Sequence, residues 1–285
     1  MDEVWTVRAG QVPYEEARAA QKLLEQARHG GDVPDLLLLL EHPPVYTKGR
    51  RSTPDELPMG EDWYRMQGID VRETDRGGRV TYHGPGQLVG YPIMSLGALH
   101  HRAAPGREAE DVARMDVGDY IRRMERTIIG ALDDWSIPAA TIDGLTGVWT
   151  EGARPGTGVS GDAGLPVSEA RKIGSIGVHV NRGVTTHGFA INVNNDLQPF
   201  EWVVPCGIEA CQMTSLTREL GAVQDLDRFA TTVRDRFGEV YERRPVEVAA
   251  AELAARVEGV EAIAAAAPFP TDGKPVTNGK PAAVR

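Results

Sequence analysis

The sequence is poor in cysteine and has no excess of positive charge. Its 285 residues include only two cysteines, Cys206 and Cys211, too few for the disulfide framework of a secreted protein of this size. Lys and Arg number 31 against 41 Asp and Glu, a net charge of -10. Because phosphate neutralisation needs a basic face, this balance disfavours a general nucleic-acid binder.

Long hydrophobic runs are also lacking. The longest purely aliphatic run covers 36–40, far short of the roughly 20 residues that span a bilayer. The first residues, MDEVWTVRAG, carry acidic groups where a signal peptide needs positive charge. With 41% hydrophobic residues, the composition is that of a globular protein. We therefore expect a cytoplasmic protein without a membrane partner.

Recognisable nucleotide and metal motifs are absent or out of context. GTGVSG at 156–161 matches G-x-G-x-x-G, but Pro155 and further glycines surround it, whereas a dinucleotide site needs a strand before it and a helix after it. A flexible loop is the simpler interpretation. The spacings between the two cysteines and between His179 and His187 do not match structural zinc sites. We expect no cofactor and no metal.

Hydrophobic periodicity divides the chain into helices and strands. Apolar residues at helical spacing predict helices, and short β-prone stretches between glycine-rich turns predict strands. The predicted helices cover 13–30, 112–135, 226–241 and 246–265, and the predicted strands cover 35–47, 69–94 and the hairpin 171–193. This order predicts an α/β (α+β) fold with mixed sheets flanked by helices.

Cys206 is the first candidate for chemistry. It lies in VVPCGI, between Pro205 and Gly207, where a strand ends and the backbone can turn tightly. A lone cysteine is often a small core residue. A nucleophilic thiol needs a nearby base or cation, because only a few per cent is ionised at neutral pH.

Lys172 can supply that base. It opens KIGSIGVHV, the first strand of the predicted hairpin, and Gly174 and Gly177 allow a ligand or another backbone to approach closely. The alternative is a lysine solvated at the end of a strand.

A third constellation, RGGRVTYHGPGQ at 76–87, places His83 between two pairs of glycines. Such a segment can direct backbone N–H groups and a histidine against a bound carbonyl, although a plain glycine turn has a similar sequence. His187 and Gly188 repeat the His-Gly pair on the second hairpin strand, which suggests that both histidines line one pocket.

Together these segments resemble the lipoyl(octanoyl) transferase family, the octanoyl-[acyl-carrier-protein]:protein N-octanoyltransferases. The resemblance rests on RGGRVTYHGPGQLVGYP at 76–92, RKIGSIGVHVNRGVTTHGFAINVNNDL at 171–197 and PFEWVVPCGI at 199–208. It implies the fold of the biotin/lipoate protein ligase catalytic domain. The resemblance covers 1–245, which we expect to be the catalytic domain. Two segments depart from the family pattern: the long loop at 151–168, expected to be an insertion, and 246–266, expected to be a helical extension. The low apolar content of 267–285 predicts a disordered tail.

The resemblance also implies a role for individual residues. Cys206 is then the acyl-thioester nucleophile, and Lys172 assists proton transfer. The implied substrate-binding residues are Arg76, Gly77, Gly78, Arg79, Val80, Thr81, Tyr82, His83, Ser175, Ile176, Gly177, Gly188, Phe189 and Ala190.

The implied reaction moves an octanoyl group from octanoyl-acyl carrier protein to a lysine of a lipoyl domain. The acceptors are the lipoyl domains of 2-oxoacid dehydrogenase E2 subunits and the glycine-cleavage H protein. Backbone N–H groups, with His83, would stabilise the oxyanion. Residues expected either to line an apolar tunnel or to pack in the core are Leu88, Val89, Ile176 and Phe189. Basic side chains expected either to steer the acidic carrier or to be simply solvated are Lys48, Arg50, Arg51, Arg76 and Arg79.

Three other functions remain open on sequence alone. An ATP-dependent lipoate or biotin ligase shares the implied fold but needs no nucleophilic cysteine. A transferase acting between lipoyl proteins also uses a cysteine, and a catalytically inactive scaffold uses none.

Overall fold

The computed structural model describes residues 2–99, 116–150, 170–203 and 212–269. The strands are β1 (Glu3–Gln11), β2 (Asp35–Glu41), β3 (Val45–Lys48), β4 (Asp70–Glu73), β5 (Thr81–His83), β6 (Gln87–Ile93), β7 (Ala139–Ile142), β8 (Leu145–Thr150), β9 (Arg171–Asn181), β10 (Val184–Asn192), β11 (Gln212–Met213) and β12 (Arg244–Glu247). The α-helices are α1 (Tyr14–Gly30), α2 (Glu61–Met66), α3 (Leu96–Leu99), α4 (Val117–Asp133), α5 (Leu216–Leu220), α6 (Leu226–Tyr241), α7 (Ala250–Arg256) and α8 (Glu261–Ala265), and the 3-10 helices are η1 (Pro54–Glu56) and η3 (Gln198–Trp202).

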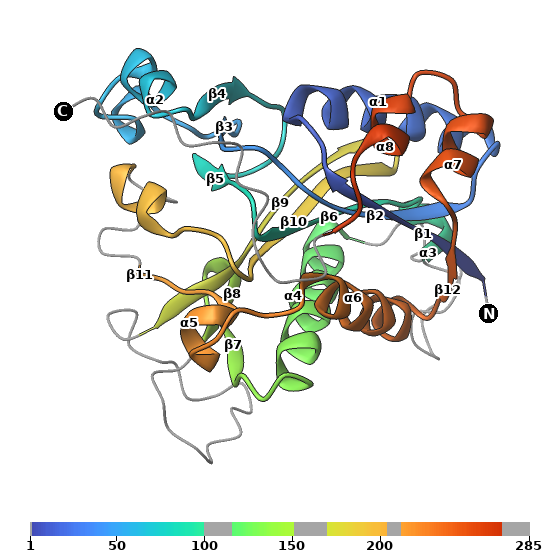
Figure 1. Ribbon diagram of the computed structural model, residues 1–285. Coiled ribbons are helices and arrows are strands. Elements are labelled where there is room, and N and C mark those ends of the chain that lie inside the picture. The colour runs from blue at the N-terminus through green and yellow to red at the C-terminus, as the bar shows by residue number, and fades with distance from the viewer. Residues whose placement is uncertain (1, 100–115, 151–169, 204–211, 270–285) are drawn as a thin grey trace.

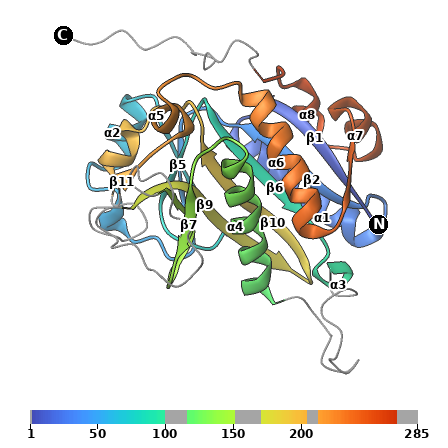
Figure 2. The ribbon, with the colours of Figure 1, turned by 90° about the horizontal axis from the view of Figure 1, so that it is seen from below.

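A large mixed sheet organises the molecule. Its strands follow the order β12-β1-β2-β6-β10-β9-β8-β7, and β11 pairs with β9 beside this path. Helices α1, α7 and α8 cover one face, and α4 and α6 cover the other (Figures 1 and 2). A smaller sheet, in the order β4-β3-β5, lies beside the large one. The predicted class of mixed sheets flanked by helices is confirmed.

Strand β2 shows why the sheet is covered on both faces. Its sequence DLLLLLE is buried along its whole length, as expected of a strand that contributes to two cores. Leu37 and Leu39 pack in the core under α4 and α6. Leu36, Leu38 and Leu40 alternate with them and pack in the core under α1 and α7.

The predicted hairpin 171–193 is confirmed as β9 and β10, joined by a turn at Arg182 and Gly183. The helix predicted at 226–241 is α6, and the helix predicted at 13–30 is α1. These elements carry long, regular hydrophobic patterns, which are the most reliable signals in a sequence.

The alanine-rich segment departs from the single helix predicted at 246–265. It begins with the end of β12, which pairs in parallel with β1, and continues as the separate helices α7 and α8. Gly259, between them, has a φ of 89°, a left-handed conformation that ends a helix. The division of the chain at 245 stays a prediction. Phe269 is buried in the core, and the tail beyond it lies outside the described residues.

Candidate active site

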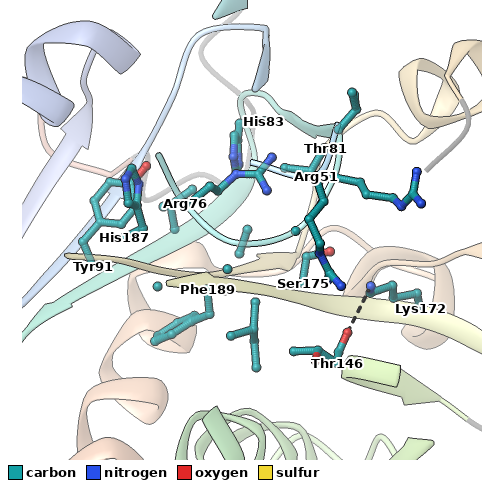
Figure 3. Close-up of a pocket in the computed structure, with 18 of the residues that line it drawn as sticks. Arg51, Arg76, Thr81, His83, Tyr91, Thr146, Lys172, Ser175, His187 and Phe189 are labelled. Atoms are coloured by element: carbon teal, nitrogen blue, oxygen red, sulfur yellow. Dashed lines mark hydrogen bonds between the residues drawn. The ribbon is translucent and has the colours of Figure 1, made fainter. Parts of the chain in front are cut away.

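A cavity of about 320 Å³ lies between the β9–β10 hairpin and the glycine-rich segment that leads into β5 (Figure 3). This volume is within the range of small-molecule pockets, about 300–1,000 Å³. Predicted site residues that line it are Lys172, Arg76, Gly78, Arg79, Val80, Thr81, His83, Ser175, Ile176, Gly177, Gly188, Phe189 and Ala190. Segments distant in sequence therefore meet at one cavity.

Two expected substrate-binding residues, Gly77 and Tyr82, are not part of the cavity lining, and of the two alternatives left open for Leu88 the structure has core packing. The Gly77 N–H donates to the Val178 carbonyl at 2.9 Å, which ties the glycine-rich segment to β9. Tyr82 packs with Tyr46 in the core of the small sheet. Leu88 is fully buried in the large core and does not line the cavity. Strand alternation explains Leu88, because its neighbour Val89 faces the cavity instead.

Lys172 is buried in the wall of the cavity, with 3% of its surface exposed. Its Nζ donates to the Thr146 carbonyl at 3.3 Å and lies 5.0 Å from the centre of the Trp149 ring. The pairing of β8 with β9 shifts by one residue between Gly174 and Lys172, and such a bulge redirects a side chain. The alternative of a solvated strand end is therefore wrong.

Cys206 and Cys211 lie outside the described residues. The first strand after their segment, β11, pairs with β9, with Met213 opposite Lys172. The Thr214 N–H also donates to the Lys172 carbonyl at 2.9 Å. The chain that follows the P-C-G-I motif is thus joined to the strand that carries Lys172.

Arg76 holds the glycine-rich segment in place. The side chain is buried, and its Nη2 donates to the carbonyl and the Oγ1 of Thr47 at 2.7 and 2.8 Å. Because Thr47 lies on β3, these bonds fix the segment to the small sheet. Figure 3 shows Arg76 beside His83 at the cavity.

His83 has a defined hydrogen-bonding state. Its Nδ1 lies 2.7 Å from Gln87 Oε1, and Gln87 Nε2 donates to Tyr82 O and to Asn192 Oδ1. Gln87 Oε1 is therefore an acceptor, and His83 Nδ1 carries the proton. Burial lowers the pKa of His83 well below its usual value, so the ring is neutral and Nε2 is an acceptor. This arrangement does not fit the expected role of His83 as a donor to an oxyanion.

His187 shares the cavity with His83, as the repeated His-Gly pair suggests. Its φ is 58° although it lies within β10, an uncommon conformation that is often found at functional sites. Gln21 Oε1 accepts from its backbone N–H at 2.7 Å, and Asp75 Oδ1 lies 2.8 Å from Nε2. Burial lowers the pKa of His187, and the bond to His187 holds the pKa of Asp75 well below its usual value.

Most of the chain matches the model of one protein family. Residues 13–238 match the model described as the lipoyl protein ligase A/B catalytic domain. The chain belongs to this family.

Relatives of this lipoyl protein ligase A/B domain agree with the match. A protein of Mycobacterium leprae (strain TN), named an octanoyltransferase, is 44% identical over 220 residues, which is 76% of this chain and 80% of that protein. An octanoyltransferase of Myxococcus xanthus is 40% identical over 247 residues, which is 87% of this chain but 62% of that protein. The chain therefore matches less than two thirds of the length of the Myxococcus protein.

A solved structure shows the same fold at low sequence identity. It is a bipartite lipoate protein ligase from Thermoplasma acidophilum, studied with its E2 lipoyl domain, with a TM-score of 0.62 and 15% identity. The similarity covers 93% of this chain and 91% of that one. At 15% identity the comparison supports the fold only and carries no conclusion about activity.

Two of the basic side chains expected to steer a carrier, Lys48 and Arg79, form salt bridges with glutamates. Lys48 pairs with Glu61 and Glu73 at 2.9 and 3.1 Å, and Arg79 pairs with Glu56 at 2.6 Å. Arg51 extends at the edge of the cavity (Figure 3).

Some lining residues are not singled out as candidates by the sequence, although Tyr91 lies in the motif at 76–92. They are Tyr14, Tyr91, Gly144, Leu145 and Thr146. The Tyr91 hydroxyl lies 2.7 Å from His42 Nε2, and His42 Nδ1 lies 2.7 Å from the Val12 carbonyl oxygen.

Within the described ranges, no helix is long and apolar enough to cross a membrane, and no group of three or more His, Cys, Asp or Glu is placed to hold a metal ion.

Proposed function

We propose that this protein transfers an octanoyl group from octanoyl-acyl carrier protein to a specific lysine of a lipoyl domain. The observation that carries the proposal is the buried Lys172 at the cavity wall, on the strand to which β11 ties the chain following Cys206. Relatives at 40–44% identity that are named octanoyltransferases support it.

In the first step Lys172 takes the proton of the Cys206 thiol, and the thiolate attacks the thioester carbon. A carbon–sulfur bond to Cys206 forms and the bond to the carrier sulfur breaks. The proton passes from Lys172 to the departing thiolate. The product is an octanoyl thioester on Cys206.

In the second step the ε-amine of the acceptor lysine attacks that thioester carbon, and Lys172 takes a proton from the amine. An amide bond forms, and the sulfur of Cys206 leaves and regains its proton. Thioester exchange is close to isoenergetic and aminolysis runs downhill, so the reaction needs no ATP. The acceptors that we propose are the lipoyl domains of dehydrogenase E2 subunits and the glycine-cleavage H protein.

The cavity has the chemistry that this substrate requires. Apolar side chains that line it and would contact the acyl chain are Val80, Val89, Leu145, Ile176, Phe189 and Ala190. The neutral His83 contributes an acceptor, so we assign oxyanion binding to backbone N–H groups of the glycine-rich segments. Gly77 and Tyr82 hold the glycine-rich segment at 76–87 in place, through the bond of Gly77 to Val178 and the packing of Tyr82 on Tyr46.

The test is a transfer assay with octanoyl-acyl carrier protein and an unmodified lipoyl domain, followed by the mass of the lipoyl domain. We expect a gain of one octanoyl group without ATP. Cys206→Ala should abolish the transfer, and Cys211→Ala should retain it.

Separate arms of the assay test the alternative functions. Modification that requires ATP and free octanoate, and that survives Cys206→Ala, would show a ligase instead. Transfer only from an octanoylated lipoyl protein would make the donor a lipoyl protein. No modification in any arm would indicate a scaffold.

A further inference from the structure

One peptide group connects Lys172 to a buried carboxylate that lines no part of the cavity. The Thr146 carbonyl accepts from Lys172 Nζ at 3.3 Å. The N–H of the same peptide group, that of Gly147, donates to Glu125 Oε1 at 3.0 Å. Because the C=O and N–H of a trans peptide point in opposite directions within one plane, the carboxylate and the amine are bonded at opposite edges of one rigid group.

Glu125 is an unusual residue for its position on α4. Its side chain is 1% exposed, and its Oε2 accepts from Arg122 Nη1 at 2.6 Å. Burying a carboxylate is costly. The Arg122 side chain is 52% exposed, so solvent screens the ion pair and it adds little stability. The placement is better explained by what Glu125 does to the peptide group that it contacts.

The geometry of Gly147 is adapted to the same contact. Its φ is 129°, and a Cβ there would lie 2.6 Å from the Gly174 carbonyl and 2.9 Å from Lys172 Cε. Only glycine combines this backbone conformation with such a close approach. The peptide can therefore turn its carbonyl to Lys172 and its N–H to Glu125 without displacing the lysine.

We propose that Glu125 is a positioning residue for Lys172. Its carboxylate orients and polarises the Thr146–Gly147 peptide group, because hydrogen bonds in a chain strengthen one another. The polarised carbonyl holds Nζ at the cavity wall and stabilises the positive charge that Lys172 gains on taking a proton. Glu125 itself exchanges no proton with substrate. This inference rests on the proton-transfer role proposed for Lys172.

The test is a double-mutant cycle with Glu125→Gln and Lys172→Ala, read as the steady-state rate of octanoyl transfer to a lipoyl domain at varied concentrations of octanoyl-acyl carrier protein. The rates are measured at pH 8.5, near the ordinary pKa of a thiol, so that the Lys172→Ala backgrounds retain measurable turnover. In the wild-type background we expect Glu125→Gln to lower kcat about tenfold and to change KM for octanoyl-acyl carrier protein less than about twofold. In the Lys172→Ala background we expect no further loss.

Asp35→Asn is the matched control. Asp35 is also a buried carboxylate outside the cavity lining, and it accepts from an arginine and a backbone N–H, those of Arg28 and Ser95. Unlike Thr146, whose carbonyl bonds Lys172, neither of these partners lines the cavity. We expect this variant to lose stability and to retain kcat. Unfolding of each variant is followed in parallel. If Glu125→Gln does not fold, Glu125→Asp replaces it, because a shorter side chain withdraws the carboxylate from Gly147 while keeping the charge.

The outcomes separate the two proposals. An equal loss from Glu125→Gln in both backgrounds would overturn the positioning role and leave the proposed function standing. A normal rate in Lys172→Ala alone would overturn the role of Lys172 and the inference that rests on it.

Discussion

At the residue scale, the proposed chemistry depends on how Lys172 is held. Lys172 is buried, bonded to the Thr146 carbonyl and close to the Trp149 ring. Each of these features limits the positions that Nζ can take. A lysine fixed in this way can accept a proton at a defined point without losing side-chain freedom at the moment of reaction.

Gly147→Ala tests this restraint. A methyl group at this position would meet Lys172 Cε at 2.9 Å and the Gly174 carbonyl at 2.6 Å. We expect the rate of octanoylation to fall at least about tenfold, because displacing a catalytic group by an ångström costs one to two orders of magnitude. Single-turnover mass spectrometry measures the rate.

Gly31→Ala is the control for this variant. Gly31 has a φ of 81° but no atom within 4 Å of an added Cβ. It should lose about 1–2 kcal/mol of stability from its backbone conformation and keep its rate. Similar losses of activity in both variants would contradict the account.

The sequence predicts some of these residues and not others. Lys172, His83 and His187 stand in glycine-rich motifs whose composition indicates a site. Glu125 is one of several charged residues on an amphipathic helix, and its contact with Gly147 depends on how α4 packs on β8. No local pattern encodes that contact. The state of His83 also depends on a distant partner, because Asn192 fixes the orientation of Gln87.

At the element scale, the hairpin of β9 and β10 supplies much of the cavity. Its regular period of two predicts it well from sequence, because each strand has apolar side chains facing a core. The bulge beside Lys172 depends instead on the pairing with β8 and could not be predicted. The alanine-rich segment 246–265 was mispredicted as one helix because Gly259 interrupts it and its first residues join the sheet.

A substitution of Phe189 on β10 tests the proposal that the cavity holds the acyl chain. Its side chain is buried at the cavity and packs against the large core. Phe189→Leu removes volume, so we expect the ratio of kcat/KM for decanoyl over octanoyl donors to rise about tenfold, the scale on which a pocket discriminates a methylene group or two. Parallel assays with the two donors measure the ratio.

Ile191→Val on the same strand provides the comparison. Ile191 is fully buried in the core and does not line the cavity, so this variant should lose about 1 kcal/mol of stability without a change in the ratio. A ratio that moves equally in both variants would mean that Phe189 does not contact the acyl chain.

At the scale of the whole molecule, buried histidines make the stability of the fold depend on pH. Burial lowers the pKa of His42 to about 4, whereas an unfolded histidine titrates near 6.5. Between about pH 4 and pH 6.5, His42 is therefore protonated in the unfolded chain and neutral in the folded protein. The contribution to stability is complete above about pH 6.5 and is lost as the pH falls toward 4.

We expect the free energy of unfolding to fall by about 3 kcal/mol from His42 alone over this window, from 2.5 pKa units at about 1.36 kcal/mol each. His83 and His187 add with the same sign, because burial lowers the pKa of each. Denaturant titrations at pH 7, 6 and 5 measure the slope. His42→Gln should flatten it, and an identical slope in that variant would contradict the assignment.

The central claim is that an octanoyl group is carried on Cys206 without ATP. Its most direct test is the intact mass of the protein after mixing with octanoyl-acyl carrier protein alone, followed by peptide mapping. We expect a gain of one octanoyl group on Cys206, absent in Cys206→Ala, slowed in Lys172→Ala and discharged by a lipoyl domain. A lipoyl domain that becomes octanoylated while the protein itself never gains mass, or an adduct that persists in Cys206→Ala, would contradict the account.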